Sequence, residues 1–262
     1  MNLFSEVFFF VPYSWEVLFG TLAALLLASL CGAKLVKQIR RAETQTSDDV
    51  RMVLGATLTL LGLAVGFSFS MAISGYNARQ TSESAEAAAI GSAYAKADLL
   101  PAQTTEKMKQ VLAEYVAQRI RFYTARSEDA RQAEERQAAT LRRDAWQIAV
   151  QGSLSQPNSL TALAVATVGD LQKSYETTSS TWRKQIPSAA WGLIFILAVF
   201  CNVLVGYSAG ARGHRGLLIV FPLVIAISLA LINDIDVPGH GLIHVSPVNL
   251  ERMASELAVP LK

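Results

Sequence analysis

The residues best suited to bind an ion stand beside long apolar stretches. The segment "NDIDVPGHGLIHVS" places Asp234 and Asp236 directly after an apolar run, and it holds His240 and His244 four residues apart. On a helix, two histidines at that spacing could hold a metal ion. Pro238 and its glycine neighbours predict a tight turn instead, and no third ligand is evident. The sequence therefore predicts no metal site. The two carboxylates either cap backbone amides in this turn or serve a cation site or a pore mouth.

A second charged pair, Arg79 and Glu83, is also spaced by four residues, in "NARQTSE". On a solvated helix such a pair contributes about 0.2–0.5 kcal/mol. Repeated around an oligomer, Arg79 would instead form a ring of positive charge that attracts anions to a pore mouth. In that alternative, Asp234 and Asp236 would belong to the same mouth. Both interpretations stay open at this stage.

Small and weakly polar residues recur along the segment "LGLAVGFSFSMAISGYNARQ" and just before it. Each residue of an α-helix turns by about 100°, which places one set of them on a single face, the small-residue stripe. The stripe consists of Gly55, Thr59, Gly62, Gly66, Ser70 and Asn77. Ser84, Ala88, Gly91 and Ala95 continue it along a helix of about 45 residues. The stripe predicts either close helix packing or a pore wall. In a pore, Phe67 and Phe69 would form constrictions, since the edge of an aromatic ring is electropositive.

The composition indicates what kind of protein carries these residues. Of its 262 residues, 52% are hydrophobic, which favours a membrane protein. The net charge of +2 gives no reason to expect nucleic acid as a partner. Crossing a bilayer takes about 20 apolar residues. Four stretches approach or exceed that length, at about 15–33, 52–73, 189–206 and 216–232. We therefore expect an all-α membrane protein with four transmembrane helices in a lipid bilayer.

The long segment between the second and third stretches predicts a helical bundle. Within it, "TTEKMKQVLAEYVAQRIRFYTAR" repeats apolar residues at spacings of three and four, as a helix with one buried face does. The expected organisation is a transmembrane hairpin at 1–74, an extramembrane helical bundle at 75–187 and a second hairpin at 188–234. A turn and short C-terminal helix follow at 235–262.

Basic residues in short loops predict the orientation, because such loops face the cytoplasm. The two loops carry Lys34, Lys37, Arg40, Arg41, Arg51, Arg212 and Arg215. The termini and the helical insert are then expected on the outer side. We expect a multi-pass protein of a bacterial inner membrane.

Three segments together are similar to one known family. "LLGLAVGFSFSMAISGYNAR", "EAAAIGSAYAKADLLP" and "NDIDVPGHGLIHVSPVNL" resemble the bestrophin-like domain family of bacterial membrane proteins. The family's distant likeness to bestrophins implies a pentameric anion channel with four spans and a helical insert after the second. In bestrophins the insert and the termini are cytoplasmic, whereas the basic loops of this chain predict the reverse.

Two functions are compatible with these patterns. The first is a homo-oligomeric, anion-conducting channel, for chloride or other small anions, with the second span lining the path. The alternative is a membrane-anchored interaction or sensory module whose helical bundle binds a ligand or partner. No phosphate-binding loop, dinucleotide fingerprint or nucleophile elbow is recognisable. We therefore expect no enzyme, no catalytic residue and no cofactor.

Overall fold

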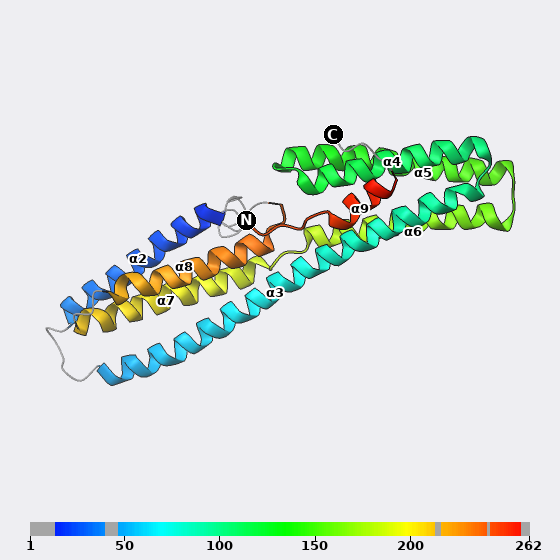
Figure 1. The fold of residues 1–262 in the computed structure, drawn as a ribbon. Coiled ribbons are helices and arrows are strands. Elements are labelled where there is room, and N and C mark those ends of the chain that lie inside the picture. The colour runs from blue at the N-terminus through cyan, green and yellow to red at the C-terminus, as the bar shows by residue number, and fades with distance from the viewer. Residues whose placement is uncertain (1–13, 40–46, 213–215, 240–241, 258–262) are drawn as a thin grey trace, which may run out of the picture. The chain divides into compact units, whose positions relative to one another are not determined.

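The computed structural model describes residues 14–39, 47–212, 216–239 and 242–257, and within them the chain is helical without a strand (Figure 1). The helices are α2 (Ser14–Ile39), α3 (Ser47–Lys96), η1 (Ala97–Leu99), α4 (Ala102–Thr124), α5 (Glu128–Ser155), α6 (Ser159–Arg183), α7 (Ser188–Arg212), α8 (Leu217–Asp236) and α9 (Val248–Glu256). Four stretches are long and apolar enough to cross a membrane, and they include α2, the first half of α3, α7 and α8. The fold is that of an all-α membrane protein, as predicted. Arg40, Arg41, Arg215 and His240 lie outside the described residues.

The chain divides into two compact units. The membrane unit comprises Met1–Ser74 and Gln185–Ile243, and the insert unit comprises Gly75–Lys184 and His244–Lys262. The segment after the fourth span thus contributes to both units. Helix α3 belongs to both as well, with its first half in the membrane unit.

Helix α3 is continuous over 50 residues, which confirms the prediction that the second span runs on into the insert without a break. Seven of the 21 residues from Tyr76 to Lys96 are alanine, the residue that favours a helix most. No proline occurs between Ser47 and Leu100, and Pro101 follows where the helical path ends. Leu100, directly before that proline, is extended, as residues preceding proline usually are. The Thr105 hydroxyl donates to the carbonyls of Ala97 and Leu100.

The insert unit is held together by one apolar core. Helix α4 buries the face that its sequence periodicity predicts, including Met108, Leu112 and Val116. The polar helix α5 packs against α4 and α6 through small residues on one side, which include Ala138 and Ala145. Arg131 is buried on this same side, and the other charged side chains of α5 are left to the remaining faces. Helix α5 is therefore packed along a narrow alanine seam rather than through a broad apolar face.

Two glycines bring α2 and α7 into backbone contact within the membrane unit. A Cβ atom on Gly206 would collide with the carbonyl oxygen of Ser29, and one on Gly32 would collide with the carbonyl oxygen of Val203. Small residues allow this close approach of membrane helices. The closest glycine packing described in this unit therefore lies here. Asn202, on the same helix, is fully buried and donates to the carbonyl of Ala198 one turn earlier.

Replacing Gly206 by alanine should destabilise the membrane unit. The new methyl group must push α2 and α7 apart, and such overpacking costs about 1–3 kcal/mol. Gly192→Ala is the matched control, because it makes the same change in α7 where no atom lies within 4 Å. Thermal denaturation of the purified protein in mild detergent measures both. Equal melting temperatures for the two variants would contradict the close approach.

Candidate functional site

The small-residue stripe lies on a face of α3 that the chain itself leaves open. Its six residues, Gly55, Thr59, Gly62, Gly66, Ser70 and Asn77, are all exposed. Around Gly55, Gly62 and Gly66, no atom of the described residues lies within 4 Å of where a Cβ would stand. The residues that α3 buries in the membrane unit, Thr57, Leu61, Ser68 and Ala72, project from a different side of the helix. Among the described residues, none packs against the glycines of the stripe, so this face of α3 is available to a neighbour.

The two phenylalanines expected at constrictions differ in their position relative to the stripe. Both are exposed, Phe67 by 64% and Phe69 by 39%. Phe69 follows Gly62 by seven residues and therefore lies on the same face of the helix. Phe67 is adjacent to Gly66 in sequence and so projects about 100° away from it. Of the two rings, Phe69 is the one placed to border a path along the stripe.

Arg79 lies on the buried side of α3, not on the stripe. It follows Ala72 by seven residues, which places both on the same helix face, and only 1% of its surface is exposed. A straight α3 therefore cannot turn Gly62, Gly66 and Arg79 toward one axis. The prediction of a solvated surface pair between Arg79 and Glu83 is therefore wrong, because Glu83 is equally buried.

The Glu83 carboxylate caps helix α9 inside the insert unit. It accepts hydrogen bonds from the backbone N–H groups of Asn249 and Leu250, both at 2.9 Å, and from the Asn249 side chain at 2.6 Å. A carboxylate at a helix N-terminus accepts hydrogen bonds from the free N–H groups and interacts favourably with the positive end of the helix dipole. On the same helix pair, Gly91 leaves room for the side chain of Met253. The insert end of α3 thus holds α9 in place.

Asp234 and Asp236 hold the backbone around the end of α8. Asp234 accepts hydrogen bonds from the N–H groups of Leu242 and Ile243 at 2.8–3.1 Å. Asp236 accepts one from the N–H of Ile186 at 3.0 Å. Amide capping was one of the two alternatives for these carboxylates. They are buried rather than solvated, at 4% and 6% exposure.

The insert unit contains a buried ion pair that was not predicted from the sequence. The Arg119 guanidinium of α4 contacts both oxygens of Glu86 from α3, with Nε at 2.8 Å and Nη2 at 3.1 Å. The Tyr115 hydroxyl donates to the same carboxylate at 2.8 Å, and Glu135 of α5 lies 3.2 Å from Arg119. The guanidinium also lies over the rings of neighbouring aromatics, with that of Phe122 at 4.3 Å. One cluster therefore joins α3, α4 and α5.

The charges of this cluster depend on one another. Burial opposes the positive charge of Arg119, but the Glu86 carboxylate together with Tyr115 and Tyr123 outweighs it and raises the pKa of the guanidinium. Burial, and next the negative charge of Glu86, raise the pKa of the Tyr115 phenol well above its usual value. A sequence signal existed, because Arg119 falls on the apolar face of α4, seven residues after Leu112. Glu86, Arg119 and Tyr115 are closed to solvent, so this part of the cluster serves the architecture of the insert rather than a ligand.

The fold defines a class of helical membrane proteins in which a helical insert interrupts the spans after the second. The profile of the Bestrophin-like domain matches residues 19–250, so the chain belongs to this family. Among curated proteins, none matches the sequence.

Solved structures show the same fold. A bacterial bestrophin homolog from Klebsiella pneumoniae is 14% identical, with a TM-score of 0.60 over 91% of this chain and 95% of its own. A variant of that homolog gives 0.61 over 92% and 97%, again at 14% identity. A structure described as a membrane protein gives the same values as that variant. This likeness extends over nearly the whole chain and concerns the fold.

Proposed function

We propose that the protein is a homo-oligomeric channel for small anions such as chloride, with α3 lining the path. The observation that carries the proposal is the open small-residue stripe, whose glycines meet no neighbour among the described residues. Family membership supports it, since bestrophins are anion channels. The proposed oligomer is a pentamer in the bacterial inner membrane.

Copies arranged around an axis would turn their stripes toward one another. Small side chains then leave a path between the helices, and the edge of the Phe69 ring supplies a weakly positive, apolar constriction. Arg79, Asp234 and Asp236 remain in the proposal as charged groups near the mouth. Since they are buried, they act on the ion through their electric field rather than by contact.

The proposed orientation places the termini and the insert outside the cytoplasm. It rests on the basic loop residues. Of these, Lys34 lies in the last turns of α2 and Arg51 in the first turns of α3. A cysteine introduced at Arg51 should react in intact cells only with a membrane-permeant thiol reagent. Reaction with an impermeant reagent would reverse the orientation.

Oligomeric mass and anion flux together test the function. Purified protein in mild detergent should have the mass of a pentamer of 28.3 kDa chains. Liposomes that contain the protein and are loaded with potassium chloride should release chloride once potassium can also leave them and balance the charge. A monomer, or liposomes that release no more chloride than protein-free ones, would reject the channel. The alternative of an interaction or sensory module would then stand.

A further inference from the structure

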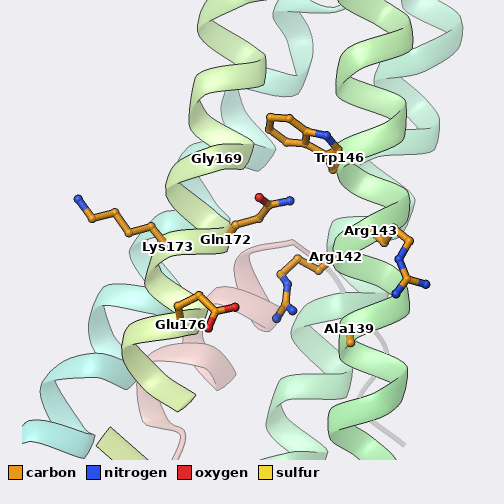
Figure 2. A pocket seen from close by; sticks show the side chains of 8 residues that line it. All are labelled: Ala139, Arg142, Arg143, Trp146, Gly169, Gln172, Lys173 and Glu176. Carbon is orange, nitrogen blue, oxygen red and sulfur yellow. The ribbon is translucent and has the colours of Figure 1, made fainter. Parts of the chain in front are cut away.

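The insert unit holds an open groove between α5 and α6 that none of the features above uses. Its volume is about 500 Å³, which lies within the usual range for small-molecule sites. The groove is lined by Ala139, Arg142, Arg143, Trp146, Gly169, Gln172, Lys173 and Glu176. Figure 2 shows the Trp146 ring, the Gln172 amide and the Arg142 guanidinium in the space between the helices, whereas Arg143 and Lys173 point outward on either side of it.

The charge in the groove favours an anion. The lining holds three basic residues, Arg142, Arg143 and Lys173, and one acidic residue, Glu176. Arg142 is held rigidly, because its guanidinium lies over the Tyr175 ring with Cζ 3.3 Å from the ring centre. Among the described residues, no atom accepts a hydrogen bond from its buried Nη1. A donor of this kind lacks the partner that buried polar groups normally have. The guanidinium as a whole can pair with a carboxylate or phosphate group in the bidentate geometry that arginine prefers.

The other end of the groove is suited to a flat ring. Trp146 is 37% exposed although it is large and apolar. A Cβ on Gly169, opposite it, would lie 4.0 Å from the indole, so any longer side chain there would cover the ring. Glycine at this position keeps the ring accessible for stacking. Trp146 follows Arg142 by four residues, which puts their Cβ atoms about one helical turn, or roughly 5–6 Å, apart on the same side of α5.

We propose that this groove binds an organic anion in which a planar ring is joined to a carboxylate or phosphate group. The acidic group pairs with Arg142, while Arg143 and Lys173 raise the local anion concentration. The ring stacks on Trp146, and Gln172 and Glu176 hydrogen-bond to its polar edge. The site belongs to the insert and does not depend on whether the spans conduct ions.

Equilibrium binding to the purified full-length protein tests the two halves of the site separately. Adenosine monophosphate and indole-3-acetate carry a ring and an anionic group, adenosine carries the ring alone, and inorganic phosphate carries the charge alone. At least one of the two ring-bearing anions should bind about tenfold or more tightly than adenosine and phosphate, with weaker binding at high salt. Failure of both anions to bind, or equal binding of phosphate, would overturn the proposal.

Variants locate the binding within the groove. Arg142→Gln should lower the affinity for the anion by about tenfold or more. Gly169→Leu should lower it to a similar extent by covering Trp146. Arg136→Gln removes an exposed cation from the same helix outside the groove, and it should leave binding unchanged. If Arg136→Gln weakens binding as much as Arg142→Gln, the attraction is only the general charge of α5 and the site is wrong. Chloride release by the same preparations is scored independently, so failure of this site and failure of the channel are distinguishable.

Discussion

Replacement of Arg119 by methionine should destabilise the insert unit by about 3–5 kcal/mol, the cost of leaving one partner of a buried ion pair without the other. Arg119 and Glu86 are 1% and 0% exposed, and two guanidinium nitrogens contact the carboxylate. Without Arg119, only the Tyr115 hydroxyl among the contacts described still donates to Glu86. Hydrogen exchange of α4 amides in the detergent-solubilised protein measures the loss within the insert unit.

Two further variants separate the ion pair from ordinary packing. Lys109→Met makes a similar change on the same helix, but the Lys109 side chain pairs with the exposed Asp98, so its effect should be small. The double variant Glu86→Leu/Arg119→Met removes both charges. It should recover most of the protection of the α4 amides against hydrogen exchange that Arg119→Met loses. A double variant as unstable as Arg119→Met would show that aromatic packing around the guanidinium, rather than the uncompensated carboxylate, sets the cost.

Leucine at Gly62 or Gly66 should reduce chloride release from liposomes to nearly the level without protein. In the proposed oligomer each copy carries the substitution, so several isobutyl groups would meet in the path at one height. A single chain tolerates them, since neither glycine has a neighbour within 4 Å. Flux and oligomeric mass, measured on the same preparation, give the result.

Gly20→Leu is the matched control for the stripe, because Gly20 is also exposed, on α2, with no atom within 4 Å. It should conduct like the unsubstituted protein. Stripe variants that assemble and conduct normally would contradict a path along this face. Stripe variants that no longer assemble would instead assign the stripe to close packing between copies, the other function that small residues serve in membranes.

Local patterns predicted what depends on neighbours along one helix. Apolar length indicated the four spans, and the period of 3.6 residues indicated the buried face of α4 and the direction of the stripe on α3. No such pattern could join Glu86 to Arg119 or Glu83 to Asn249, because these partners lie 33 and 166 residues apart. Arg79 shows the related difficulty: its spacing from Glu83 was correct for a surface pair, but burial gave Glu83 other partners.

Glycine packing shows a further reason why the site was harder to predict than the fold. The pattern around Gly62 and Gly66 resembles that of closely packed membrane helices, yet the contact occurs at Gly32 and Gly206. A small residue permits close approach without specifying the helix that approaches. The stripe's role depends on neighbouring copies, whose arrangement is not encoded in the periodicity of one helix.

The cap that Glu83 places on α9 has a consequence for how the protein is made. The ribosome adds 166 residues after Glu83 before Asn249 exists, and at about 5–20 residues per second this takes roughly 10–30 s. During that interval α7 and α8 are synthesised, while the carboxylate lacks the three donors that later cover it. The insert unit therefore cannot reach its final form until the third and fourth spans have been synthesised. An insert with its cap in place is thus found only on chains whose whole membrane unit has already been translated.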